Sequence, residues 1–184
     1  MNISMNGGQI VRLLVFVFVL VTNGYAADET QRAQNHHPWW ITVGGGPSMI
    51  GGVFSMSAGM VYTYQFENSI ISGRILGITN INPTVQKISP EQTNYKMADY
   101  GVLYGPIWHY GRSYVSCGAG LGLVRASAQN GISSARNTSI SLPVEVQWFW
   151  QPTHFAGFGM YAYASANFER PMYGLLLCAQ LGVW

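Results

Sequence analysis

The chain has 184 residues, enough for one domain, and only 9% of them are charged, against about 25% in a typical soluble protein. Aromatic residues make up 14%, glycine contributes 22 residues, and the mean hydropathy of +0.14 is too low for a bundle of membrane-spanning helices. After residue 26, eight Lys and Arg stand against seven Asp and Glu, so there is no electrostatic case for binding nucleic acid.

The N-terminus has the pattern of a secretory signal. Arg12 and the α-amino group supply positive charge, and Leu13 to Val21 form an unbroken apolar run that is too short to span a bilayer. Gly24 and Ala26 place small residues at the two positions that signal peptidase reads, so we expect cleavage between Ala26 and Ala27. The expected organisation is a signal peptide over 1–26, a polar lead-in over 27–38 and one folded domain over 39–184.

Downstream of the lead-in, large apolar side chains alternate with small or polar ones. Residues 53–65 show this most clearly, with Phe54 to Tyr64 on one parity and Ser55 to Gln65 on the other. A period of two is that of a β-strand, and the length suits a strand that crosses a bilayer at a tilt (about 9–11 residues). The pattern predicts eight strands, over residues 39–47, 53–65, 69–79, 97–108, 113–126, 139–150, 155–166 and 173–184.

The direction of the apolar face decides the class of barrel. A lipocalin-like soluble barrel turns its apolar face inward to hold a ligand, whereas a membrane barrel turns it outward. An inward face here would crowd Trp148, Trp150 and several tyrosines into one narrow lumen and leave Gly and Ser facing water. We therefore predict an all-β fold, an eight-stranded antiparallel up-and-down transmembrane β-barrel, with the soluble barrel as an alternative.

The connections between the predicted strands differ in length. Residues 66–68, 109–112 and 151–154 are short, whereas 80–96 and 127–138 are longer and polar. Short turns on one side and long loops on the other are typical of bacterial outer-membrane barrels, with the short turns in the periplasm. An even number of strands places both ends of the barrel, and the lead-in 27–38, on the periplasmic side. The long loops 80–96 and 127–138 would then face the cell exterior and could contact an extracellular ligand.

Aromatic residues gather at the strand ends assigned to the periplasmic side. Rings with a polar tip are favoured at the membrane–water interface, so we interpret these residues as an interfacial belt. Ordinary strand aromatics are the alternative. The predicted belt consists of Trp39, Trp40, Tyr62, Tyr64, Trp108, Trp148 and Trp150.

Several ionisable residues lie within predicted strands. Asp99 and Glu145 fall on the polar parity of their strands, and Gln147 shares that parity with Glu145. Arg74 shares a parity with Ser72. An Arg that faced the bilayer centre would cost about 2–4 kcal/mol, so an inward Arg74 is preferred. We hypothesise that these four side chains form a polar plug in the lumen; solvated side chains near the rims are the alternative. Arg125 continues the outer parity of its strand but lies at the strand end, where it can snorkel.

Cys117 and Cys178 fall in the fifth and eighth predicted strands, which are not neighbours in a meander. A disulfide requires Cα atoms within about 7 Å. We expect two free, buried thiols, although the sequence leaves a bridge open.

With its strand count, loop asymmetry, Gly-rich strand 113–126 and terminal aromatic, the chain resembles the small eight-stranded outer-membrane barrels of the OmpA and OmpX type over residues 39–184. The resemblance implies an outer-membrane monomer in contact with membrane lipids and lipopolysaccharide. It also implies that Trp184 serves as the signal for the barrel-assembly machinery. Gly182 and Gln180 share the parity of Trp184, where the family usually has apolar residues.

Enzymatic patterns are weak. Lipid A deacylases with this fold use a His and a Ser two residues apart on a late strand. Here His154 is followed by Phe155 and Ala156, and Ser165 is preceded two positions earlier by Tyr163, so no base lies beside the hydroxyl. The four histidines fit no metal motif. We expect a non-enzymatic structural or surface-interaction protein without cofactor or metal; a lipid-modifying enzyme is the alternative.

Overall fold

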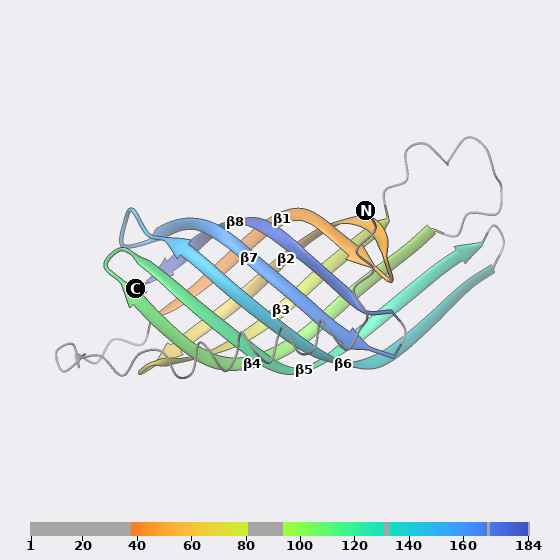
Figure 1. The fold of residues 1–184 in the computed structure, drawn as a ribbon, viewed down its shortest axis with the longest axis horizontal. Coiled ribbons are helices and arrows are strands. Elements are labelled where there is room, and N and C mark those ends of the chain that lie inside the picture. The colour runs from red at the N-terminus through yellow and green to blue at the C-terminus, as the bar shows by residue number, and fades with distance from the viewer. Residues whose placement is uncertain (1–37, 81–93, 131–132, 169, 184) are drawn as a thin grey trace, which may run out of the picture. The chain divides into compact units, whose positions relative to one another are not determined.

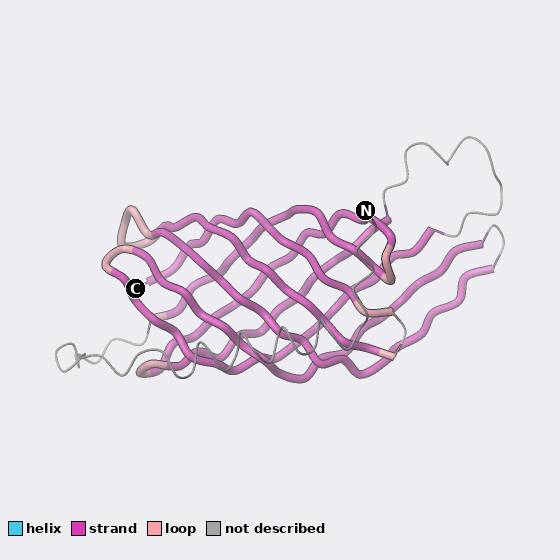
Figure 2. Tube along the Cα trace, in the orientation of Figure 1, coloured by secondary structure: helices cyan, strands magenta, loops and turns pink. Residues whose placement is uncertain are grey.

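The computed structural model describes residues 38–80, 94–130, 133–168 and 170–183. Eight strands pair in sequence order, each antiparallel to its neighbours, and β8 closes on β1 to complete a barrel (Figures 1 and 2). The strands are β1 (Trp39–Ile50), β2 (Val53–Phe66), β3 (Ser69–Asn80), β4 (Asn94–Tyr110), β5 (Ser113–Asn130), β6 (Ser133–Trp150), β7 (Ala156–Asn167) and β8 (Met172–Val183). This arrangement confirms the predicted eight-stranded antiparallel barrel. In the described ranges no helix is long and apolar enough to cross a membrane.

The alternation in the sequence sets which side chains face out. Successive side chains of a strand point to opposite faces of the sheet, so closing the sheet buries one parity and exposes the other. In β2, Phe54 is 58% exposed on the outside and its neighbour Ser55 is fully buried. In β6, Ile140 and Leu142 are exposed while Ser141 is buried. The apolar face therefore lies outside, opposite to the arrangement that a lipocalin-like carrier requires.

The strands are tilted and staggered around the barrel. A path of paired residues that leaves β1 at Trp39 returns to β1 at Met49, further along the strand. Such a shift is the stagger that closes a barrel of tilted strands, and eight strands leave an interior that side chains can fill. The path runs through Trp39, Tyr64, Ile71, Tyr104, Ala119, Val144, Ala164, Tyr173 and Met49.

Three prolines lie inside strands. At Pro47, Pro106 and Pro143 the pairing skips two positions and resumes in the same register. Proline has no N–H to donate to the ladder, which is why it interrupts pairing in a sheet interior. Glycine lets the backbones approach closely there, because a Cβ on Gly105 would lie 1.9 Å from the carbonyl oxygen of Cys117.

The strand ends agree with the expected turns on one side of the barrel and differ on the other. The predicted loop 127–138 is wrong, because β5 continues to Asn130 and β6 already begins at Ser133. This Ser-, Ala- and Asn-rich segment has no alternation of apolar and polar residues. The period of two could therefore not predict that its residues form strands. In the other predicted loop, Asn80 closes β3 and residues 94–96 open β4, while 81–93 lie outside the described residues.

Candidate functional site

The middle of the lumen holds a buried ion pair. Arg74 of β3 forms a salt bridge with Asp99 of the adjacent strand β4, and both side chains are fully buried. Arg74 Nη1 also donates to the hydroxyl of Tyr161 at 3.4 Å and to the carbonyl oxygen of Val144 at 3.4 Å. On its other side Asp99 accepts a hydrogen bond of 3.3 Å from the hydroxyl of Ser141. The pair is thus tied to β6 and β7 across the barrel.

A second carboxylate extends this network. Glu145 of β6 accepts hydrogen bonds from the hydroxyl of Tyr161 at 2.5 Å and from Nε2 of Gln147 at 2.9 Å. Tyr161 therefore links Glu145 to Arg74. The Arg74 guanidinium also lies 5.7 Å from the ring centroid of Tyr163, within the range of a cation–π contact.

The network balances charges that would be costly alone. Arg74, Asp99 and Glu145 are the charged side chains buried within the described part of the chain. Burying an ion is tolerated when a partner and hydrogen bonds replace water, whereas removing one partner typically costs about 3–5 kcal/mol. One guanidinium faces two carboxylates here, and hydroxyl and amide donors add to the compensation. Within the described residues Arg74 Nε and Gln147 Oε1 make no hydrogen bond. We call this group, Arg74, Asp99, Ser141, Glu145, Gln147, Tyr161 and Tyr163, the polar plug.

All four residues predicted for the lumen lie in the polar plug. The two tyrosines of β7 were not among the predicted lumen residues, although the sequence carries a signal for them. On that strand Gly157, Gly159, Tyr161, Tyr163 and Ser165 share one parity. Small residues on the same parity as two tyrosines indicate an inward face on which large rings have space.

A layer of aromatic side chains closes the lumen at the end where β1 begins and β8 ends, which we call the terminal end. The ring of Tyr114 lies between Trp40 and Phe149, with centroid distances of 5.4 and 5.6 Å. Gln180 donates through Nε2 to the hydroxyl of Tyr114, and to Thr42 Oγ1 at 2.8 Å.

The assignment of Trp40 to the outer aromatic belt is therefore wrong. Trp40 is fully buried, whereas its neighbour Trp39 is 39% exposed. Adjacent residues of a strand face opposite sides of the sheet, so only one of the two can lie outside. The apolar parity of β1 continues from Trp39 to Ile41 and Val43, which are both exposed.

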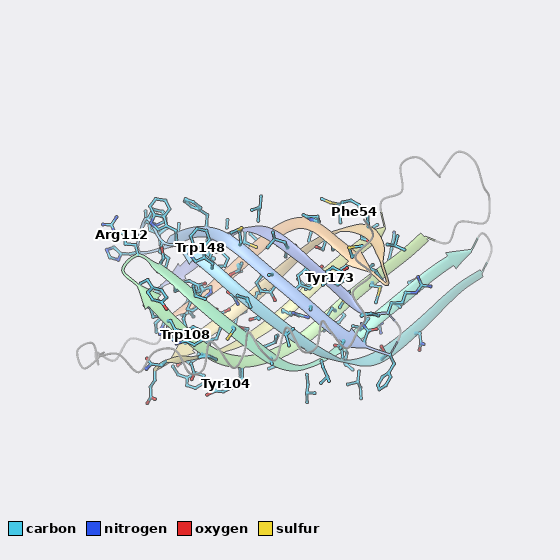
Figure 3. The ribbon with its side chains drawn as sticks, in the orientation of Figure 1. Phe54, Tyr104, Trp108, Arg112, Trp148 and Tyr173 are labelled. Atoms are coloured by element: carbon cyan, nitrogen blue, oxygen red, sulfur yellow. The ribbon has the colours of Figure 1, made fainter. Side chains whose placement is uncertain are left out.

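The other predicted aromatics lie on the outer face at the terminal end. Figure 3 shows Trp108 and Trp148 near that end and Phe54 and Tyr173 near the opposite one. Tyr62, Trp148 and Trp150 are exposed, and Tyr64 and Trp108 are partly buried. Trp39 stacks on Tyr62 with centroids 6.2 Å apart. The six rings thus lie on the outer face of β1, β2, β4 and β6 at one barrel end.

At the opposite end, aliphatic and methionine side chains from five strands point inward, and each is at most 4% exposed. The hydroxyls of Ser48, Ser55 and Ser165 are buried beside them. Buried side chains thus occupy the described lumen in three zones, with aromatics at the terminal end, the polar plug in the middle and mostly aliphatic side chains beyond. This aliphatic group comprises Ile50, Leu76, Ile78, Met97, Val124 and Met172.

On the outside, strands β4 to β6 change from apolar to polar at one level. Tyr100, Leu123 and Ile140 are exposed and lie side by side in the register of the three strands. The next outward positions are Ala98, Arg125 and Thr138, again paired across the strands, and exposed Lys96 follows on β4. We call the part of β4–β6 beyond this level the β4–β6 extension.

The extension makes these strands the longest in the barrel. β4, β5 and β6 have 17, 18 and 18 residues, whereas β1, β3, β7 and β8 have 12 each. Figure 1 shows β5 and β6 projecting beyond the neighbouring strands. Because the additional residues lie beyond the apolar outer face and are paired as strands, they form a polar hairpin surface at that end of the barrel.

Groups that could carry chemistry are dispersed. His154 lies in the turn before β7 and is exposed, whereas Ser165 is buried near the other end of that strand, so these two residues form no Ser–His pair. In the described ranges no three His, Cys, Asp or Glu side chains are placed to hold a metal ion. Both cysteines are free, as expected, but only Cys178 is buried, because Cys117 has the outward parity of β5 and is partly exposed.

Solved structures share this architecture. The attachment invasion locus protein Ail of Yersinia pestis superposes with a TM-score of 0.59 at 15% identity, over 80% of this chain and 99% of that one. Neisserial surface protein A gives 0.58 at 16% identity, over 80% and 95%. The chain has the fold of the small outer-membrane barrels. The N-terminal β-barrel domain of Pseudomonas aeruginosa OprF, with a TM-score of 0.54 at 11% identity over 81% and 99%, agrees with this result.

The resemblance to these barrels is thus confirmed at the level of the fold. No family model matches the chain, and no curated protein matches its sequence significantly. The similarity therefore shows the fold, and a function has to be inferred from the surfaces and the lumen of this chain.

Proposed function

We propose that the protein is a non-enzymatic monomer of the bacterial outer membrane with a structural and surface-interaction role. Residues 1–26 would direct export and be removed before Ala27, and residues 27–38 would lie in the periplasm. The terminal end of the barrel then faces the periplasm and the β4–β6 extension faces the cell exterior. Lipids, including lipopolysaccharide, would surround the outer apolar face, and Trp184, which lies outside the described residues, would be read by the barrel-assembly machinery.

The observation that carries this proposal is the outer surface of the barrel. Large apolar side chains cover it, and many are around half exposed, such as Val102 at 60% and Leu121 at 67%. A soluble monomer rarely exposes a contiguous apolar patch above a few hundred Å². The six outer aromatic rings bound this surface on one side and the polar level of β4–β6 bounds it on the other, as expected for a band in contact with hydrocarbon.

The lumen supports a structural role over a transport role. The polar plug joins β3, β4, β6 and β7 by hydrogen bonds, with an aromatic layer on one side and aliphatic side chains on the other. Because these side chains fill the lumen, we expect the pure protein in a planar bilayer to show no steady conductance. A stable, large conductance would contradict the plug.

The β4–β6 extension supports the surface-interaction role. It carries two exposed cations, Lys96 on β4 and Arg125 on the adjacent strand β5. They lie near each other, because Arg125 pairs with Ala98, two residues after Lys96 on β4. One crystal structure of Ail contains the heparin analogue sucrose octasulfate. By analogy we propose that the extension of this chain contacts anionic, sulfated or phosphorylated glycans.

Heparin binding by the protein in lipid nanodiscs tests this role. The double variant Lys96→Gln/Arg125→Gln removes both cations, so we expect about a tenfold loss of affinity at low salt, since charge contacts of this kind are screened by ions. The matched control Arg112→Gln removes a cation from the turn at the terminal end and should leave binding unchanged. Equal losses in both variants, or no loss in either, would contradict the assignment of the extension.

A further inference from the structure

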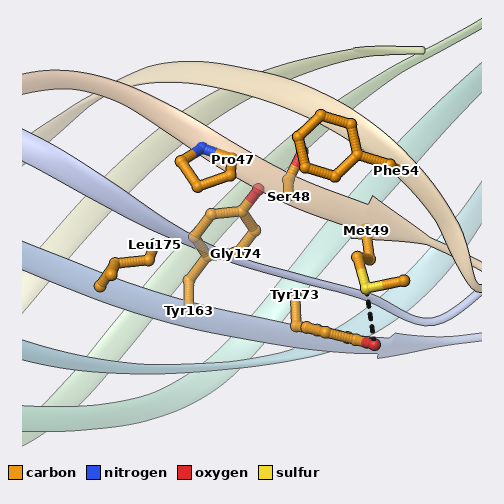
Figure 4. Close-up of a pocket in the computed structure, with 8 residues that line it drawn as sticks. All are labelled: Pro47, Ser48, Met49, Phe54, Tyr163, Tyr173, Gly174 and Leu175. Atoms are coloured by element: carbon orange, nitrogen blue, oxygen red, sulfur yellow. Dashed lines mark hydrogen bonds between the residues drawn. The ribbon is translucent and has the colours of Figure 1, made fainter. Parts of the chain in front are cut away.

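A cleft opens on the outer surface between β1 and β8, close to the barrel end opposite the terminal end. Its volume is about 430 Å³. Pro47, Phe54, Tyr173 and Leu175 form apolar walls, and the side chains of Ser48 and Tyr163 line it as well (Figure 4). We call it the β1–β8 cleft.

The cleft coincides with an interruption of the sheet. The ladder between β1 and β8 pairs Gly45 with Leu177 and Ser48 with Gly174, and skips Gly46 and Pro47 in between. Pro47 cannot donate a ladder hydrogen bond, so its local chemistry accounts for the gap.

Glycine allows one lumen side chain to reach the cleft. Tyr163 of β7 pairs with Gly174 of β8 and lies against it, since a Cβ on Gly174 would be 2.8 Å from the Tyr163 hydroxyl. Figure 4 shows this hydroxyl pointing toward Pro47 and Ser48. The cleft therefore combines walls from the outer surface with a phenol from the inner one.

The polar groups in the cleft are suited to a ligand with an acceptor. Ser48 and Tyr163 are 3% and 4% exposed. The Tyr163 hydroxyl lies close to the hydroxyls of Ser48 and Ser57, but within the described residues neither Ser48 nor Tyr163 makes a side-chain hydrogen bond of ordinary distance and angle. Buried hydroxyls normally have partners. An ester or hydroxyl oxygen of a ligand in the cleft would supply one.

A cation lies on the rim nearby. The side chain of Arg170, from the turn between β7 and β8, packs against Gly51 in the β1–β2 turn, where an added Cβ would be 3.1 Å from Arg170 Cδ. Both turns are at the barrel end next to the cleft, so the guanidinium of Arg170 lies on the rim side of the cleft.

We propose that the β1–β8 cleft binds one acyl chain of lipid A, the phosphorylated, acylated glycolipid of lipopolysaccharide. The inference rests on the proposed function, because that orientation opens the cleft to the outer leaflet and makes its walls continuous with the lipid-facing surface. Ser48 and Tyr163 donate hydrogen bonds to the ester or hydroxyl oxygens of the chain, and Arg170 lies on the side of the phosphates.

The test is retention of lipid A by the protein in phosphatidylcholine nanodiscs, counted by native mass spectrometry and titrated with purified lipid A. Leu175→Trp fills the cleft and should lower affinity at least about tenfold. Leu177→Trp is the matched control, because Leu177 is 70% exposed on the same strand and does not line the cleft. Tyr163→Phe keeps the ring against Gly174 and removes only the donor, and should weaken binding about three- to tenfold.

The outcomes are distinct. Equal binding by Leu175→Trp and Leu177→Trp, equal retention of phosphatidylglycerol and lipid A, or the mass of a second copy in place of a lipid would each overturn the inference. Failure to enter nanodiscs as a folded barrel would instead overturn the proposed function. Insertion without retained lipid A would overturn this inference alone.

Discussion

The two sides of the barrel wall differ in length but share the same outer band. Strands β1, β7 and β8 have 12 residues each, close to what a tilted crossing needs, whereas β5 and β6 have 18. Yet the outward-facing apolar side chains of β5 and β6 end at Leu123 and Ile140. The additional residues therefore do not lengthen the band. Strands β1, β7 and β8 thus have the length of the apolar band, whereas β5 and β6 cross the band and project beyond it.

We expect the largest changes in the free energy of unfolding from substitutions in the lumen, because the short and the long strands both contribute side chains to it. Arg74→Met leaves Asp99 and Glu145 buried without their cation, so we expect a loss of about 3–5 kcal/mol in the free energy of unfolding. Urea unfolding in lipid vesicles measures it. The double variant Arg74→Met/Asp99→Leu should recover part of the loss, because it removes a buried carboxylate together with its partner. Wild-type stability in the single variant would contradict the plug.

A charge scan along β6 sharpens the boundary between the spanning and the projecting part. Val146 lies within the band and is 42% exposed, whereas Thr138 lies beyond Ile140. We expect Val146→Arg to lower the free energy of unfolding by about 2–4 kcal/mol and Thr138→Arg by about 0–1 kcal/mol. The same vesicle assay compares them. Similar losses at the two positions would place the boundary elsewhere.

The smallest effect on stability is expected from shortening the extension. Replacing residues 128–135 by Asn-Gly closes the hairpin at the paired residues Ser127 and Arg136 with a favoured two-residue turn. Because the replaced residues lie beyond the apolar band, the free energy of unfolding should change by less than about 1 kcal/mol. Heparin binding should fall if the glycan contacts more of the extension than Lys96 and Arg125, and a large loss of stability would show that the hairpin supports the barrel.

The sequence was sufficient to predict which side chains face outward in strands that have one apolar face. Parity oriented β2, β4, β5 and β6 correctly and placed Asp99, Glu145 and Gln147 inside. Arg74 was placed inside by the cost of exposing an Arg to lipid. It misplaced Trp40 because aromatic composition at a strand end was weighed above the alternation of neighbouring residues.

Two other features could not be predicted from periodicity. The sequence of the extension has polar residues at both odd and even positions. It therefore lacks the alternation of apolar and polar residues that would have predicted the strands up to the pair Asn130 and Ser133. The β1–β8 cleft depends on the three-dimensional proximity of Pro47 to Tyr163, which come from strands at separate ends of the sequence. Only barrel closure brings them together.

Quenching of tryptophan fluorescence by brominated phospholipids tests most directly whether hydrocarbon surrounds the barrel. Two single-tryptophan variants in vesicles suffice, one that retains Trp148, which is 46% exposed, and one that retains Trp40, which is fully buried. We expect strong quenching of Trp148 and little quenching of Trp40. Weak quenching of Trp148, together with a protein that stays dispersed in buffer without detergent, would contradict a hydrocarbon-surrounded barrel.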